Sequence, residues 1–302
     1  MKIYVNRRPV HGPWGGGSKI LLAIIQECQN RGHEILLEEQ HKSCDKVDAI
    51  LCVDPRPVQG VNYRDILDLR SRSECPLIQR VGDIGTHGKP DLYEMVLKTT
   101  KLADAVIFPS EWVKNVIEFN GKFEIIKNGA DKRFFENKKS TFDLGKKIRV
   151  ITHHWSNNQA KGFDTYQQLS SFCESSNDFE FTYIGRAPIG NNFQTHLAPM
   201  DVEGLVKELP KHDIYLTASK WEAGANHVLE AMAIGLPILY HVDGGSIPEY
   251  CSSNGLSFEN VEDVKRILLN RLYSNIIGCV NYDRTTECVA QEYVNVIERV
   301  CS

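Results

Sequence analysis

Residues 221–237 read WEAGANHVLEAMAIGLP and predict a turn, a helix and the start of a strand. Small residues at positions 224 and 225 form the turn. An apolar segment with helical spacing begins at Asn226, which we expect to be the N-cap. The strand expected at 214–217 runs directly into this turn. The helix N-terminus therefore opens at the carboxyl end of a strand, where its backbone N–H groups are able to bind a phosphate.

Two glutamates flank this helix start. Glu222 lies in the loop before the helix, and Glu230 lies about one turn into it. A carboxylate accepts hydrogen bonds from hydroxyl groups, so one glutamate is able to bind a ribose and the other a sugar. Taken alone, a pair of glutamates is also consistent with two solvated charges. Further on, residues 244–249 read GGSIPE and predict a second close approach of the backbone.

Short apolar segments alternate with helix-period segments along the whole chain, which is typical of parallel sheets covered by helices. In the first half the expected strands are 2–6, 34–38, 49–53, 76–81, 105–109 and 124–127, and the expected helices are 18–30, 91–102 and 112–119. In the second half the expected strands are 148–152, 179–184, 195–197, 214–217 and 237–241, and the expected helices are 163–174, 202–209, 226–234, 261–272 and 287–300. The sequence therefore predicts an α/β protein with two Rossmann-like, doubly wound parallel-sheet domains.

The domain boundary is expected in the polar segment 131–147, which has no sustained period and precedes a fresh strand. We predict an N-terminal domain at 1–140 and a second domain at 141–285. Ligands of open α/β sheets bind outside the carboxyl ends of the strands. The predicted active site therefore lies in a cleft across which the two domains face each other.

The composition is that of a chain that folds throughout, with 302 residues, 42% hydrophobic and 25% charged. No run approaches the roughly 18 apolar residues of a membrane-spanning helix, and the first residues read as a strand rather than a secretion signal. The nine cysteines are odd in number and include no CxxC pair. This pattern predicts reduced thiols in a cytoplasmic protein rather than zinc ligands or disulfides.

The net charge of −4 is unevenly distributed, because the first half carries an excess of basic residues and the second half an excess of acidic ones. A basic N-terminal half indicates an anionic partner, peripheral contact with a membrane surface, or attraction between the two halves. Residues 112–119 have the spacing of a membrane-docking helix, although that spacing is more typical of a core helix. Nucleic acid is not an expected partner, because a pI of about 6.2 and the lack of a Lys/Arg stripe supply little phosphate neutralisation.

A glycine-rich turn follows the first expected strand, where residues 15–18 read GGGS and a helix begins at once. Such a turn lets backbone N–H groups approach an anion closely, although a tight turn without a ligand explains it equally well. The spacing is not the GxGxxG of a dinucleotide site, and Glu38 and Glu39 do not supply the acidic partner of that fingerprint.

Together these motifs resemble family 4 of the retaining, nucleotide-sugar-dependent glycosyltransferases, which have the GT-B fold. Glu222 and Glu230 stand in that family's E-x7-E arrangement. The similarity spans nearly the whole chain in the right order. The other similar segments are GGGS (15–18), GHEI (32–35), SEW (110–112), NGAD (128–131) with Phe134, KGFD (161–164), EAMAIGLPI (230–238) and GGSIPE (244–249).

The resemblance implies a role for each matching residue. Glu230 binds the ribose of the nucleotide, Glu222 contacts the donor sugar, and Lys161 holds the diphosphate together with the helix start. The glycine loop lies against the diphosphate or the acceptor from the opposite domain, and the segment 286–302 crosses back onto the N-terminal, acceptor-binding domain. The implied nucleotide-binding residues in these two places are Gly16, Gly17, Gly224, Ala225, Asn226 and His227.

This chain departs from the family pattern at two places. Where the family has an arginine shortly before the lysine, residues 152–161 read THHWSNNQAK, so His154 or Arg186 is expected to take its place. His153 and His154 point to opposite faces of a strand, so at most one of them faces the site, and both are also consistent with packed core residues. The family often has a histidine after the fourth strand; here Asp83 or His87 is expected to serve.

The resemblance predicts an enzyme that moves a sugar with retention from a UDP- or GDP-type donor to a hydroxyl acceptor, such as a glycan or another glycoconjugate. The nucleotide sugar is a co-substrate, and no cofactor is expected. The sequence has no Asp-x-Asp to bridge a metal to the diphosphate, so metal independence is also predicted. Two alternatives remain at this point. One is another sugar-nucleotide enzyme such as an epimerase or hydrolase, and the other is a non-catalytic sugar-nucleotide-binding protein.

Overall fold

The computed structural model describes residues 1–10, 16–57 and 61–302, without the side chains at 16, 39 and 41. The described chain forms two compact units. The first unit contains residues 1–10, 16–129 and 286–302, and the second contains residues 130–285. Residues 131–147, expected as a connection, belong to the second unit, where the fully buried Phe134 packs in the core beside Ala231.

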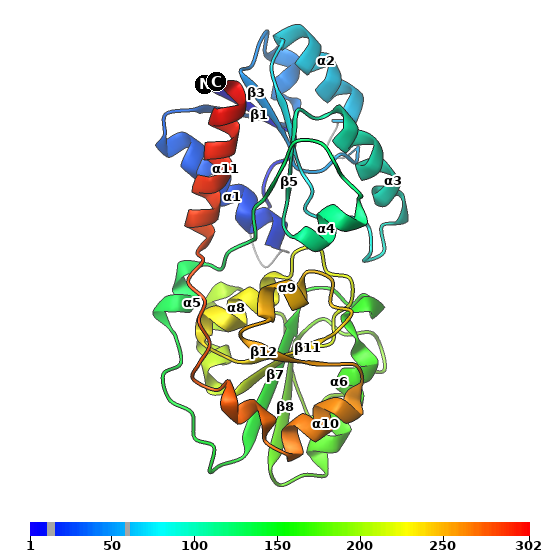
Figure 1. The fold of residues 1–302 in the computed structure, drawn as a ribbon, viewed down its shortest axis with the longest axis vertical. Coiled ribbons are helices and arrows are strands. Elements are labelled where there is room, and N and C mark those ends of the chain that lie inside the picture. The colour runs from blue at the N-terminus through cyan, green and yellow to red at the C-terminus, as the bar shows by residue number, and fades with distance from the viewer. Residues whose placement is uncertain (11–15, 58–60) are drawn as a thin grey trace. The chain divides into compact units, whose positions relative to one another are not determined.

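The first unit is built on a six-stranded sheet whose strand pairs are all parallel, in the order β2-β1-β3-β4-β5-β6 (Figure 1). Its strands are β1 (Lys2–Val5), β2 (Glu34–Leu37), β3 (Ala49–Cys52), β4 (Leu77–Arg80), β5 (Ala105–Phe108) and β6 (Phe123–Ile125). Its helices are α1 (Gly16–Asn30), α2 (Tyr63–Ser73), α3 (Pro90–Thr99), α4 (Glu111–Val116) and α11 (Thr286–Cys301), with 3₁₀ turns η1 (Glu38–Ser43) and η2 (Thr100–Leu102).

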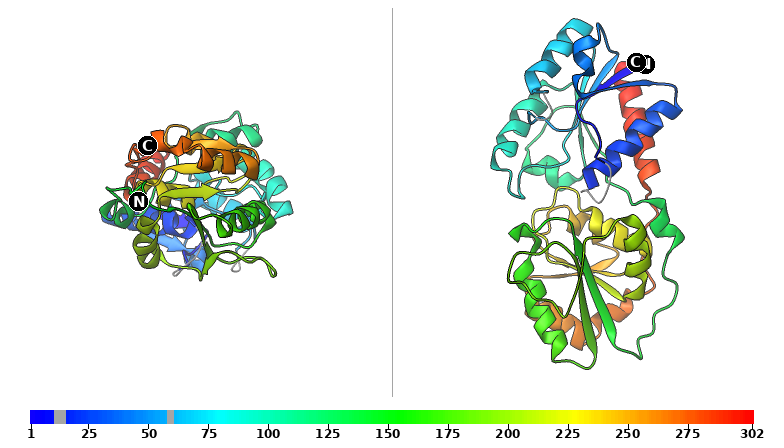
Figure 2. Two further views of the ribbon diagram at one scale, coloured as in Figure 1. Left: turned by 90° about the horizontal axis from the view of Figure 1, so that it is seen from below. Right: turned by 180° about the vertical axis from the view of Figure 1, so that it is seen from behind.

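Helix α11 lies beside α1 on one face of this sheet, although the two are far apart in the sequence (Figures 1 and 2). Ile24 of α1 and Tyr293 of α11 are buried in one cluster with strand residues such as Ile78. Polar contacts at the edge add to this apolar contact. Glu298 accepts from Arg31 at 2.8 Å and contacts His33 Nε2 at 2.9 Å. The C-terminal helix is therefore an integral part of the first unit.

The second unit is a separate six-stranded parallel sheet in the order β12-β11-β10-β7-β8-β9. Its strands are β7 (Ile148–His154), β8 (Phe179–Gly185), β9 (Thr195–Leu197), β10 (Ile214–Thr217), β11 (Ile238–His241) and β12 (Gly255–Phe258). Its helices are α5 (Lys132–Glu136), α6 (Phe163–Glu174), α7 (Val202–Glu208), α8 (Asn226–Ile234), α9 (Ile247–Cys251) and α10 (Val261–Leu269), with 3₁₀ turns η3 (Gln159–Lys161), η4 (Leu209–Lys211) and η5 (Leu272–Asn275).

The predicted α/β class with two doubly wound parallel sheets is confirmed. The structure adds β12 and the helices α2, α5 and α9, which the sequence reading missed. Helices α5 and α9 have only five residues each, too few to show a helical period. Helix α2 reads YRDILDLRSRS and buries only Ile66 and Leu69, so its apolar stripe is narrow.

Strands β7 and β8 form the longest ladder of the second sheet and end together, with His154 opposite Gly185. Gly185 has a φ of +127°, which side-chain-bearing residues rarely adopt, and a Cβ there would collide with the carbonyl oxygen of His154. The approach of these two strand ends therefore requires glycine.

Replacing Gly185 with alanine is expected to destabilise the second unit by about 3 kcal/mol, because the new methyl group forces the β7 and β8 ends apart. The control is Gly190→Ala, at a φ of +91° with no atom within 4 Å of the added Cβ. That variant should lose only about 1 kcal/mol, from the left-handed backbone alone. Urea unfolding measures the free energy of unfolding of both variants. Equal losses in the two variants would contradict the steric account.

Candidate functional site

Three loops meet at the carboxyl edge of the second sheet. The loop 218–225 after β10 is held on one side by the Lys220 amide, which donates to the carbonyl of Ala160 at 2.8 Å. On the other side the Ser246 amide donates to the carbonyl of Glu222 at 2.8 Å. Two glycines permit these contacts. Gly162 (φ +83°) lies against Ala218, and Gly245 (φ +72°) lies against the backbone of Glu222. The close approach expected for residues 244–249 is confirmed.

This backbone arrangement brings Lys161 and Glu222 together. Lys161 Nζ lies 2.5 Å from Glu222 Oε1, and each side chain is only 12% exposed. The ammonium and the carboxylate come from different loops, 61 residues apart in sequence. An ion pair that is largely shielded from water holds both side chains in a fixed geometry. The pair therefore fixes an ammonium and a carboxylate side by side at the edge of the sheet.

Glu230 forms a second pair with a histidine. Its carboxylate Oε2 lies 2.9 Å from His153 Nε2, and both side chains are at most 10% exposed. The His153 ring also contacts the Tyr215 ring edge-on, with centroids 5.4 Å apart. Among the described residues, His153 Nδ1 is buried without a hydrogen-bond partner. Of the two neighbouring histidines, His153 is thus the one that pairs with Glu230.

His154 lies on the other face of β7 and is buried. Its Nε2 contacts the Tyr166 hydroxyl at 2.6 Å, and its ring lies 4.9 Å from that of His227. His227 Nε2 in turn contacts Thr217 Oγ1 at 3.0 Å. Burial lowers the pKa of His227 to about 3, which the carboxylates of Glu222 and Glu230 oppose only in part. His227 is therefore neutral at pH 7 and adds no cationic charge.

Helix α8 spans Asn226–Ile234 as predicted, but its N-cap differs by one residue from the prediction. Asn226 is the first helical residue rather than the N-cap, a position that Ala225 occupies. The Asn226 amide donates to the carbonyl of Gly224 at 3.1 Å, so the chain turns tightly directly before the helix. Ala225 has no side-chain oxygen to accept from the first turn, and no side-chain capping bond forms there.

Arg186 follows β8 and lies over the ring of Trp155, with its guanidinium carbon 4.2 Å from the ring centroid. Trp155 follows His154 at the end of β7, so the register of the two strands brings them together. The arginine side chain is exposed, whereas His154 is buried and hydrogen-bonded. Of the two candidates for the second cation, only Arg186 presents a charged group to solvent at this edge.

The candidates in the first unit lie at the carboxyl edge of its own sheet. Asp83 Oδ2 lies 2.5 Å from Lys89 Nζ, and Asp83 Oδ1 accepts from the Gly85 amide at 2.8 Å. Burial raises the pKa of Asp83, but the Lys89 ammonium and these hydrogen bonds outweigh it, so the pKa is lowered. His87 is half-buried in the following turn.

The glycine loop is described only in part. Gly16 and Gly17 form the first turn of α1, and an added Cβ at Gly17 would meet no atom within 4 Å. Gly15 lies outside the described residues.

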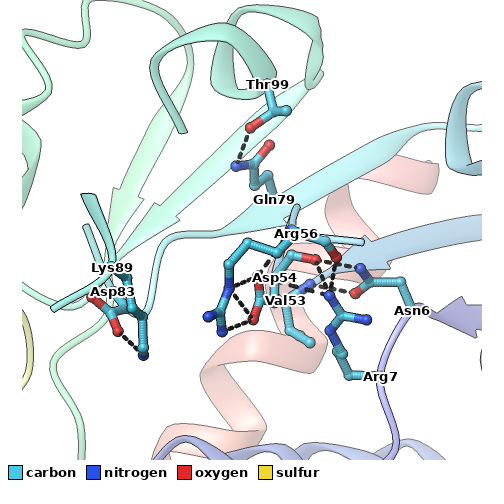
Figure 3. Close-up of polar contacts among 9 residues, drawn as sticks. All are labelled: Asn6, Arg7, Val53, Asp54, Arg56, Gln79, Asp83, Lys89 and Thr99. Atoms are coloured by element: carbon cyan, nitrogen blue, oxygen red, sulfur yellow. Dashed lines mark hydrogen bonds and ion pairs between the residues drawn. The ribbon is translucent and has the colours of Figure 1, made fainter. Parts of the chain in front are cut away.

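A charged network that the sequence reading missed surrounds the ends of β1 and β3 (Figure 3). Asn6 donates to the carbonyl of Asp54 at 2.6 Å, and the buried Arg7 donates to the same carbonyl and to that of Arg56. The Arg56 guanidinium in turn donates to both carboxylate oxygens of Asp54. The signal available in the sequence was the position of these residues directly after two buried strands.

The two units thus each gather polar side chains at a carboxyl edge. Among the described residues, no group of three or more His, Cys, Asp or Glu side chains is arranged to hold a metal ion. In the same part of the chain, no helix combines the length and the apolar character needed to cross a membrane.

Comparison with solved structures identifies the architecture. Sucrose-phosphate synthase from Thermosynechococcus elongatus aligns with a TM-score of 0.72 at 12% identity, over 99% of this chain and 98% of that one. A lipopolysaccharide outer core galactosyltransferase aligns with a TM-score of 0.68 at 13% identity, over 99% of both chains. The catalytic domain of starch synthase IV from Arabidopsis thaliana, bound to ADP and acarbose, aligns with a TM-score of 0.66 at 12% identity, again over 99% of both chains. The chain has the GT-B glycosyltransferase fold.

No protein-family model matches the sequence, and no curated protein matches it either. The structural alignments confirm the GT-B fold expected from the ordered motifs, although the aligned sequences are only 12–13% identical. In this fold the second unit of the chain carries Lys161, Glu222 and Glu230 at one sheet edge, which is the observation on which the functional argument depends.

The buried histidines of the second unit make its stability depend on pH. Burial lowers the pKa of His227 to about 3 and that of His212 to about 4. Between pH 6.5 and 4 the unfolded chain binds protons at these residues that the folded unit does not, so the free energy of unfolding falls as the pH falls. Urea unfolding at several pH values should show this slope.

His227→Gln and His212→Gln should each flatten the slope. A free energy of unfolding that stays constant from pH 7 to pH 5 would contradict this prediction.

Proposed function

We propose that the chain is a retaining glycosyltransferase that moves a sugar from a nucleoside-diphosphate sugar to a hydroxyl acceptor, such as a glycan or another glycoconjugate. The observation that carries the proposal is the Lys161–Glu222 ion pair beside the N-terminus of α8. A nucleoside diphosphate is a doubly charged leaving group, and a fixed cation together with a helix N-terminus stabilises such a group.

In this proposal Lys161 binds the diphosphate of the donor. Its pairing with Glu222 at 2.5 Å holds the ammonium in place before the donor arrives, so less reorganisation is needed on binding. Arg186, oriented by the Trp155 ring, supplies a second positive charge of the kind that the family's missing arginine provides. Both residues belong to the second unit, so the donor site is assigned to that unit alone.

Glu230 binds the ribose, because its buried carboxylate accepts hydrogen bonds and sits in the same helix that faces the diphosphate. His153 keeps one oxygen of that carboxylate engaged at 2.9 Å, which fixes the orientation of the other. Glu222, beyond its contact with Lys161, accepts from hydroxyl groups of the donor sugar. The fold is shared with starch synthase IV, whose structure contains ADP and acarbose, and this likeness supports a donor of the nucleoside-diphosphate type.

The proposed reaction breaks the bond between the anomeric carbon and the β-phosphate oxygen and forms a bond from that carbon to the acceptor oxygen on the same face. The acceptor hydroxyl gives its proton to the departing phosphate oxygen, and the nucleoside diphosphate leaves. Lys161 and Arg186 stabilise the negative charge that develops on the β-phosphate. None of these steps requires a bound metal, and the donor is proposed to be of the UDP or GDP type.

Removing the diphosphate cation should strongly reduce transfer. Because the Lys161→Ala variant leaves the Glu222 carboxylate at 12% exposure without this partner, its folded fraction is measured alongside. Lys161→Ala is expected to lower kcat/KM by about 100-fold or more, the cost typical of losing one group that stabilises transition-state charge. The matched control is Lys211→Ala. It removes another lysine of the same unit that is paired with a glutamate at 2.6 Å, but on an exposed surface. Transfer assays on the folded protein measure kcat/KM for both variants. A fully active Lys161→Ala enzyme would disprove the assignment of Lys161 to the diphosphate.

The donor class is tested by thermal shift with UDP, GDP and ADP and their sugar derivatives, since a ligand that binds only the folded state raises the unfolding temperature. One nucleotide should raise it in the wild-type protein and fail to do so in Glu230→Ala. Product analysis with and without acceptor then separates transfer from hydrolysis or epimerisation. The absence of any shift with all of these nucleotides would contradict the proposed function.

A further inference from the structure

Trp221 is held in a backbone conformation that large side chains rarely adopt. Its φ is +54°, in the left-handed region, and its side chain is 49% exposed. Such a conformation costs free energy for any residue other than glycine, and it persists only where the surrounding structure imposes it. A large aromatic residue that is both strained and exposed is poorly explained by packing.

The strain at Trp221 is imposed by the neighbouring loop. The Trp221 amide donates to the carbonyl of Asp243 at 2.9 Å, and the Glu222 amide donates to that of Gly244 at 3.2 Å. Gly245 completes the contact, because a Cβ at that position would lie 2.9 Å from the carbonyl carbon of Trp221. The preceding residue, Lys220, also contacts this loop, because its Nζ lies 3.7 Å from Asp243 Oδ2. The backbone of residue 221 is therefore held in place at this edge of the sheet.

Trp221 lies in the same loop as the proposed donor-sugar residue. Trp221 directly precedes Glu222, whose carboxylate lies 2.5 Å from Lys161. Ligand sites combine aromatic surface with a few fixed polar groups, and this arrangement suits a sugar ring. The C–H face of a pyranose packs on an indole ring, while its hydroxyl groups bind a carboxylate. Glu230, assigned to the ribose, lies eight residues further along the chain and is buried.

We propose that the exposed ring of Trp221 is a stacking platform for a sugar ring at the transfer site. The proposal rests on the proposed function and assigns to it one further binding residue. The sugar is either that of the donor or the first sugar of the acceptor, because both share the C–H face that the ring binds. Glycine at position 221 would relieve the backbone strain but would lack the aromatic ring. The platform therefore accounts for a tryptophan in this conformation.

The test compares Trp221→Gly, Trp221→Phe and the control Arg271→Gly. Arg271 has a φ of +52° and is exposed at the end of α10, so its replacement by glycine relieves the same kind of strain without affecting the platform. Both glycine variants should keep or raise the unfolding temperature. Only Trp221→Gly should lower kcat/KM for transfer, by about tenfold or more, whereas Trp221→Phe should retain most of the activity.

The affected Michaelis constant identifies the bound sugar. A rise in the KM of the nucleotide sugar, with unchanged binding of the free nucleoside diphosphate, assigns the platform to the donor. A rise in the KM of the acceptor assigns it to the acceptor. Full activity in Trp221→Gly overturns the proposal. So does a fall in its unfolding temperature that accompanies the loss of activity, or an equal loss of affinity for the free nucleoside diphosphate, which would indicate a stacked base.

Failure of the proposed function is distinguishable from failure of this inference. If the wild-type protein neither binds nucleotides nor transfers sugar, the proposed function fails. Saturation-transfer NMR with methyl glycosides of glucose, galactose and mannose then tests the platform directly. Contact with the wild-type protein that is lost in Trp221→Gly supports the platform, and contact that is equal or missing in both overturns it.

Discussion

The functional argument depends on one ion pair, between Lys161 and Glu222 at 2.5 Å. An ammonium that is 12% exposed loses hydration, and it is held at the sheet edge because the paired carboxylate compensates for that loss. The pair exists because two loops are joined by backbone hydrogen bonds, and these require glycine at 162 and 245, where φ is positive and the space is filled. Backbone geometry thus determines where the charge lies.

The same constraint explains the arrangement of the neighbouring groups. Loop 218–225 is held from both sides, so Trp221 and Glu222 have no freedom to relax, and α8 begins immediately after them. Glu230 lies within that helix and is oriented by His153, and the register of β7 and β8 sets Arg186 over Trp155. Each of these contacts depends on an edge that parallel strands create by ending together.

Much of the fold and part of the candidate site could be predicted from the sequence. Alternation of apolar and helix-period segments predicts two parallel sheets, and the glutamates of the E-x7-E arrangement and Lys161 can be identified from motif order. The pairings could not be predicted, because the choice of His153 over His154 as the partner of Glu230 depends on which face of β7 meets α8. The N-cap error at Asn226 has a similar origin, since a tight turn at Gly224 makes Ala225 the capping residue. The network around Asp54 was missed because its residues carry no motif and meet only when β1 and β3 pair.

The most direct test of the account is a crystal structure of the chain with the nucleoside-diphosphate sugar that stabilises it most. The account predicts a diphosphate within hydrogen-bond distance of Lys161 Nζ, with the ribose hydroxyls on the Glu230 carboxylate. A nucleotide bound elsewhere, with the Lys161–Glu222 pair unchanged and Glu230 remote from the ribose, would contradict it.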